Sequence, residues 1–110
     1  MSYRKNPITK VLQNAAGATG NGQVLDCAIY SVAGLQVTGT FVGTITWEVS
    51  NDGGTTWVGI LAAPTTTGTG ALTATTAGIY VVDVSAIEKL RARVSAYTSG
   101  AITVTAFQKE

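Results

Sequence analysis

Short runs in which apolar and polar side chains alternate are the feature that most constrains the fold of this chain. In the clearest run, residues 44–50, Ile45, Trp47 and Val49 share one face of an extended strand and the residues between them share the other. The cluster 51–54 (Asn-Asp-Gly-Gly) follows directly, and such pairs supply the positive φ values that tight antiparallel turns need. Alternation that ends in a glycine turn predicts a β-hairpin, in which residues 55–61 return.

The same alternation recurs along most of the chain. It is present in residues 25–30, 35–38, 79–84, 90–97 and 102–107. Both faces of the 79–84 run are partly apolar, which indicates a central strand or one that a partner covers. The last two runs flank Ser99-Gly100 and predict a C-terminal hairpin.

These runs, with turns about every 8–12 residues, amount to about seven to eight short strands and no convincing helix. The composition agrees, because 18 threonines and 13 glycines favour strands and turns, while only 12% of the residues are charged. We therefore expect an all-β chain, an antiparallel β-sandwich or a jelly-roll-like fold.

The positive charges are gathered at the start of the chain. The first ten residues carry a charge of +3, whereas residues 11–87 hold four acids and no lysine or arginine. We expect residues 1–22 to form an extended N-terminal arm and residues 23–110 to form the sandwich domain. A basic arm before a mildly acidic body favours docking on an acidic surface of another copy or another protein, and a solvated terminus is the alternative. The residues predicted to dock are Tyr3, Arg4, Lys5 and Lys10.

Composition argues against most catalytic chemistry. Without histidine there is no ordinary Ser-His-Asp or Cys-His site, and a single cysteine makes neither an internal disulfide nor a thiolate zinc site. The alternation places Cys27 inward as a small hydrophobic residue. We predict no catalytic, cofactor-binding or metal-ligating residues, and no enzyme. An enzyme built on carboxylates would draw on Asp26, Glu48 and Asp83, whose spacing does not pair them.

Residues 50–57 (SNDGGTTW) match the Asp-box pattern S-x-D-x-G-x-T-W at every fixed position. This resembles the motif of sialidases and other propeller proteins, in which the box braces a hairpin away from the catalytic centre. One copy in 110 residues cannot build a propeller, so the resemblance implies only the brace, with Asp52 capping the turn and Trp57 in the core. The alternatives are sugar binding at Trp57 and Ca²⁺ binding at Asp52. The brace residues are Ser50, Asp52, Gly54, Thr56 and Trp57.

Arg91 and Arg93 stand two apart on a predicted strand and project from one face, with Tyr97 further along it. Spaced cations beside an aromatic residue can bind nucleic acid. A net charge of only +1 makes that footprint poor, so we expect no nucleic-acid partner. Cross-strand ion pairs are the preferred interpretation, with Glu48, Asp83 or Glu88 as the acid.

The order of segments from VLDC (24–27) through LQVTGTFVGTITWEVSNDGGTTW (35–57) and AGIYVVDVS (77–85) to LRARVSAYTSGAITVTA (90–106) resembles small structural proteins of tailed bacteriophages. The likeness covers residues 23–107 and excludes the arm. It implies a β-sandwich component of the virion that assembles as a symmetric homo-oligomer. No signal peptide or apolar membrane span is visible, so we expect synthesis in the host cytoplasm and no membrane partner.

The sequence thus favours a capsid decoration, or cement, protein. It would be a homo-oligomer, expected to be a trimer, whose arm reaches the major capsid protein or an adjacent subunit and stabilises the shell through added contacts. The alternatives are a tail, connector or fibre component, or a carbohydrate-binding β-sandwich module. Such a module would need an exposed aromatic platform, for which the candidates are Tyr30, Trp47, Trp57, Tyr80 and Tyr97.

Overall fold

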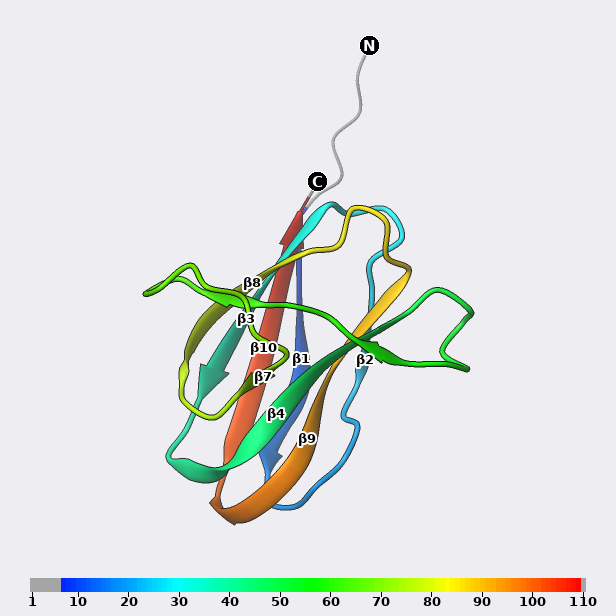
Figure 1. Ribbon diagram of the computed structural model, residues 1–110. Coiled ribbons are helices and arrows are strands. Elements are labelled where there is room, and N and C mark those ends of the chain that lie inside the picture. The colour runs from blue at the N-terminus through cyan, green and yellow to red at the C-terminus, as the bar shows by residue number, and fades with distance from the viewer. Residues whose placement is uncertain (1–6, 110) are drawn as a thin grey trace.

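The computed structural model describes residues 7–109, which form two β-sheets packed face to face (Figure 1). Within this range the chain has ten strands and no helix. The strands are β1 (Ile8–Ala16), β2 (Val24–Asp26), β3 (Val32–Thr38), β4 (Phe41–Ser50), β5 (Val58–Gly59), β6 (Ala63–Pro64), β7 (Thr73–Ala74), β8 (Gly78–Asp83), β9 (Lys89–Gly100) and β10 (Ile102–Lys109).

All strand pairs between residues 7 and 109 are antiparallel. Sheet A has the order β1-β10-β3-β8-β6, and sheet B has the order β2-β9-β4-β5 with β7 also paired to β4. The predicted all-β sandwich is therefore confirmed. The strand count is higher than predicted because β5, β6 and β7 have two residues each, too few for alternation to mark them in the sequence.

The inner faces of the two sheets make the core, as the alternation predicted. Ile45, Trp47 and Val49 of β4 are buried in sheet B, and Tyr80 and Val82 of β8 are buried in sheet A. The Trp47 and Tyr80 rings lie 5.3 Å apart at a 45° tilt, so an aromatic pair joins the sheets. Such a pair adds stability beyond the area it buries.

Two of the connections that cross between the sheets form tight corners, both at the lower end of Figure 1. One corner follows β3 at Gly39, and the other joins β9 to β10 after Gly100. These glycines have φ of 111° and 93°, and a Cβ on either would collide with the backbone of the other corner. The predicted C-terminal hairpin is therefore wrong. Its two strands form, but β9 belongs to sheet B and β10 to sheet A.

Part of the predicted arm, residues 1–22, lies within the sandwich. Residues 8–16 form β1, which pairs with β10 at the edge of sheet A. Leu12 is buried in the core, and the Gln13 side-chain amide donates to the backbone oxygen of Ala92 at 2.8 Å. Two register shifts interrupt β1, so its side chains do not follow the simple alternation that marks the other strands. The boundary at residue 22 thus does not separate an arm from the domain.

Candidate functional site

The hairpin between β4 and β5 holds the five residues named for the brace. The Ser50 hydroxyl donates to Asp52 Oδ1 at 2.7 Å and accepts the Gly54 N–H at 3.0 Å. Asp52 Oδ1 also accepts the backbone N–H groups of Thr55 and Thr56, at 3.1 and 2.9 Å. The Thr56 N–H, followed by the Ser50 hydroxyl, lowers the pKa of Asp52 to about 2, because each of these bonds favours the ionised carboxylate. These hydrogen bonds all join residues of the same turn, between Ser50 and Thr56.

Trp57 does not lie in the core, which corrects the predicted position. Its ring is half-buried, and its Nε1 donates to the Gly54 backbone oxygen at 2.9 Å. The Arg91 guanidinium carbon lies 4.1 Å from the ring centroid, in a cation–π contact. Because the Arg91 guanidinium lies over this ring and its Nε1 is bonded to Gly54, the ring is not a free stacking surface for a sugar.

The paired arginines meet one carboxylate on the outer face of sheet B. Glu48 Oε1 lies 2.9 Å from Arg91 Nη2 and 3.1 Å from Arg93 Nε, which confirms the predicted cross-strand pairing and selects Glu48. Burial of Glu48 opposes its charge, but the bonds from Arg93 and Arg91 outweigh this and hold the pKa of the carboxyl below its usual range. The two cations are therefore engaged within the chain.

Tyr97 does not share the face of the arginines, which corrects a second prediction. In the pairing of β4 with β9, Thr44 lies opposite Ala96 and Ile45 opposite Val94, so Ser95 is an extra residue. Such a bulge shifts the later side chains to the other face. Tyr97 accordingly packs against the core, and its hydroxyl donates to the Gly100 backbone oxygen at 2.7 Å.

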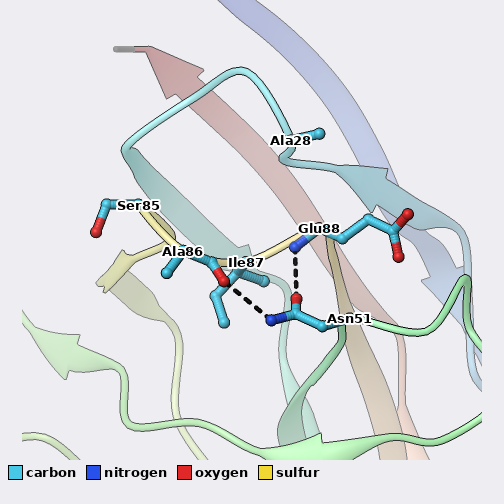
Figure 2. A pocket seen from close by; sticks show the side chains of 6 residues that line it. All are labelled: Ala28, Asn51, Ser85, Ala86, Ile87 and Glu88. Carbon is cyan, nitrogen blue, oxygen red and sulfur yellow. Dashed lines mark hydrogen bonds between the residues drawn. The ribbon is translucent and has the colours of Figure 1, made fainter.

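An open hollow of about 400 Å³ lies beside the brace, between the loops that follow β4 and β8 (Figure 2). Asn51 spans these loops: its Nδ2 donates to the Ala86 backbone oxygen at 3.0 Å, and its Oδ1 accepts the Glu88 N–H at 2.8 Å. Glu88 Oε1 in turn accepts the Gly53 N–H at 2.8 Å. The sequence offered Glu88 only as a possible partner of the arginines and gave no role to the Asn51 side chain, because the partners of both residues are 35 or more residues away. Their polar atoms hold the loops together.

The other candidate groups are dispersed or enclosed. Tyr30, Trp47 and Tyr80 are buried, so none of these three rings offers a stacking platform. Burial raises the pKa of the Cys27 thiol to about 12, which makes it unreactive. Residues 7–109 contain no group of three or more acids and cysteines placed to hold a metal ion. In the same range no helix is long and apolar enough to cross a membrane.

Of the predicted docking residues, Tyr3, Arg4 and Lys5 lie outside the described residues. Lys10 lies on β1, and its Nζ donates to the Val24 backbone oxygen at 2.7 Å. This bond ties the amine to β2 at the edge of sheet B. Lys10 therefore supports the domain itself at this position.

The outer face of sheet A is an exposed apolar surface. Val11, Ile79, Val81 and Phe107 are 45%, 44%, 40% and 48% exposed, although each belongs to a regular strand. An open hollow of about 390 Å³ lies on this face above Gly34, which has no side chain. Phe107 and Ile79 line the hollow together with Thr9, Gln36 and Thr105. Large apolar side chains grouped on one exposed face are common in surfaces that contact another molecule. This face, defined by Val11, Gly34, Ile79, Val81 and Phe107, is called the apolar face below.

No protein-family model matches the sequence, and no curated protein matches it at a significant level. Two solved structures share its fold. The SPBc2 prophage-derived protein YomS superposes with a TM-score of 0.88 at 12% identity, over 100% of this chain and 97% of that chain. The PBSX exported protein XepA superposes with a TM-score of 0.92 at 16% identity, over 100% of this chain but 39% of that chain. At these identities the likeness establishes the fold.

Proposed function

We propose that this chain is a structural protein of a bacteriophage particle, a decoration protein that binds an assembled capsid. The observation that carries the proposal is the apolar face, whose large side chains are exposed on a domain whose polar clusters are bonded internally. Two sources support the phage setting: the resemblance of residues 23–107 to phage structural proteins, and a fold shared with the SPBc2 prophage-derived protein YomS and the PBSX exported protein XepA.

In this proposal the protein acts by contact. Several copies associate with one another and with the major capsid protein, and every contact that exists only in the assembled shell stabilises that shell by mass action. The shell then resists the pressure of packaged DNA. Tyr3, Arg4 and Lys5 extend the contact onto an acidic neighbour, because they belong to the basic segment that precedes β1 in the sequence.

The test is occupancy on particles. Purified protein is added to particles that lack it, and bound copies are counted by quantitative mass spectrometry and located by electron microscopy. We expect binding in large numbers over the shell, together with a higher temperature for DNA release. Binding confined to a single ring at the tail or connector would instead favour a tail component, and no binding would refute the proposal.

The N-terminal segment is tested by deleting residues 2–6 only. A deletion that reaches Leu12 would remove a buried core residue and unfold β1, so it could not report on docking. We expect the short deletion to lower occupancy and to leave the thermal unfolding midpoint unchanged. The matched control is Lys89→Ala, which removes one cation from β9 in sheet B. Unchanged occupancy after the deletion would exclude the docking role.

A further inference from the structure

The outward residues of sheet A are arranged so that the face can complement itself. We infer that it binds the same face of a second copy, about a two-fold axis that runs along β3. This rests on the proposed self-association and deepens it by naming the surface and the contacts, with two copies at this face in place of the trimer expected from the sequence. The inference comes from the strand register of sheet A.

Three outward rows cross the middle strands of sheet A. Because β3 pairs with β10 on one side and β8 on the other, each row has one residue on each strand. In order β10, β3, β8, the rows are Lys109-Val32-Asp83, Phe107-Gly34-Val81 and Thr105-Gln36-Ile79. The alternate residues of the same strands point into the core.

A two-fold axis in the plane between two such faces, parallel to β3, reverses each row across the partner's row. Lys109 of one copy then faces Asp83 of the other, and Phe107 faces Val81. Gly34 of one copy faces Gly34 of the other on the axis. The dimer therefore contains two Lys109–Asp83 contacts between opposite charges and two Phe107–Val81 contacts between an aromatic ring and an aliphatic side chain.

The two charged residues of the first row, Lys109 and Asp83, form no ion pair among residues 7–109. The ion pairs among residues 7–109 join Glu48 to Arg91 and Arg93, and none involves Lys109. The Asp83 carboxylate binds Ser85 through Oδ1, at 2.9 Å to the backbone N–H and 2.7 Å to the hydroxyl, which leaves Oδ2 for a partner. Charge complementarity thus favours a second copy.

The size of the face also fits a pair of copies. Four interstrand spacings and about seven residues of strand give about 450 Å² in projection for each copy. Side-chain relief brings the accessible area buried by both copies to about 1,200 Å², the lower end of specific interfaces. Two sheets packed in this way lie about 10 Å apart with their strands nearly aligned, as in a β-sandwich.

The first experiment compares two identical substitutions on opposite sheets. Val81→Glu places a carboxylate in the centre of the apolar face, whereas Val58→Glu places one on β5, where Val58 is 61% exposed. Sedimentation equilibrium of the wild-type chain should show a monomer–dimer equilibrium. Val81→Glu should raise the dimer dissociation constant at least about 30-fold, the effect of losing a central contact, and Val58→Glu should leave it unchanged. Circular dichroism melting checks that both variants fold.

The second experiment tests the register. Lys109→Glu and Asp83→Lys each place like charges opposite one another twice, so each should weaken the dimer about tenfold. The double variant Lys109→Glu/Asp83→Lys restores opposite charges and should regain wild-type affinity. Melting of Asp83→Lys measures the separate cost of losing the Ser85 bonds, since that cost does not depend on association.

The third experiment tests the axis. Gln36 lies on β3 next to Gly34, so Gln36→Cys should be joined to its counterpart by a short bis-maleimide linker. The native Cys27 is buried and does not compete. Val58→Cys is the control and should remain uncrosslinked at the same concentration.

These results separate the inference from the proposed function, because they are obtained on free protein and not on particles. A wild-type chain that stays monomeric at high concentration, or that forms a trimer, overturns the inference. A dimer that Val81→Glu does not weaken, or that the charge exchange does not restore, also overturns it.

Discussion

The outer faces of the two sheets differ, although both belong to strands with the same alternation. On sheet B the outward residues near the middle of β4 and β9 are polar and bond with one another: Glu48 binds two arginines, and the Thr46 and Ser95 hydroxyls are 2.7 Å apart. The exposed apolar residues of this sheet, Val42 and Val58, lie apart from one another on β4 and β5. On sheet A the outward residues include Val81 and Phe107, which remain exposed.

This difference indicates which sheet stabilises the domain and which can bind another molecule. Polar groups that are paired within the chain gain little free energy from a partner, since any new bond must replace an existing one. An exposed apolar face retains the free energy of removing its surface from water. Sheet A is therefore the better candidate for association, and sheet B is the better candidate for holding the domain together.

The largest expected effect distinguishes the inner from the outer face. Trp47→Ala removes a fully buried ring from the core that both sheets share, and we expect a loss of about 3–5 kcal/mol of unfolding free energy. Phe107→Ala, on the exposed face, should cost less than about 1 kcal/mol in the monomer. Urea unfolding at low protein concentration measures both. Comparable losses would mean that Phe107 belongs to the monomer core.

The second-largest effect is expected at the corners where the chain passes from one sheet to the other. Gly100→Ala places a Cβ against the Thr40 backbone oxygen at a positive φ, and we expect a cost of about 3 kcal/mol. Gly53→Ala is the control, because Gly53 also has positive φ but open space around it, and it should cost about 1 kcal/mol. Thermal unfolding of the two variants gives the comparison. Equal costs would show that backbone conformation alone, without the close approach, matters at the corner.

A smaller effect tests the ion pairs on sheet B. Glu48→Gln leaves the partly buried Arg91 without its carboxylate, and we expect a loss of about 1–2 kcal/mol. The control is Asp26→Asn, at an exposed carboxylate, which should change stability by less than about 0.5 kcal/mol. Chemical denaturation at neutral pH measures both. If Glu48→Gln were neutral, the outer face of sheet B would contribute no more to stability than an ordinary surface.

The smallest effect is a pH dependence at the brace. Asp52 has a pKa of about 2 in the folded chain against an ordinary value of 3.8, so its bonds stabilise the fold above pH 4 and are lost as the pH falls toward 2. Glu48 and Asp83 are shifted in the same direction and add to this loss. Asp52→Asn should melt earlier than the wild type at pH 7, and the difference should shrink as the pH approaches 2. A difference independent of pH would assign the effect to shape rather than ionisation.

Local patterns predicted the hairpin between β4 and β5 and the shared face of Ile45, Trp47 and Val49 on β4, because both depend on neighbouring residues. The same logic failed at the C-terminus, since a strand alternates equally well when it pairs with its neighbour and when it crosses to the opposite sheet. It failed at Tyr97 because one extra residue, Ser95, reverses the faces of β9. At the N-terminus, β1 was missed because its bulges hide the period of two.

The sequence by itself determined the class of fold, because alternation and glycine turns permit strands and oppose helices. It also determined that charge is scarce and that one acid would meet the arginines. Only the tertiary structure decided which strands share a sheet and which outward residues become neighbours. Phe107, Gly34 and Val81 are far apart in the chain and become a single row only after β10, β3 and β8 pair. A contact surface is a property of that pairing, since no local pattern records which strand lies beside another.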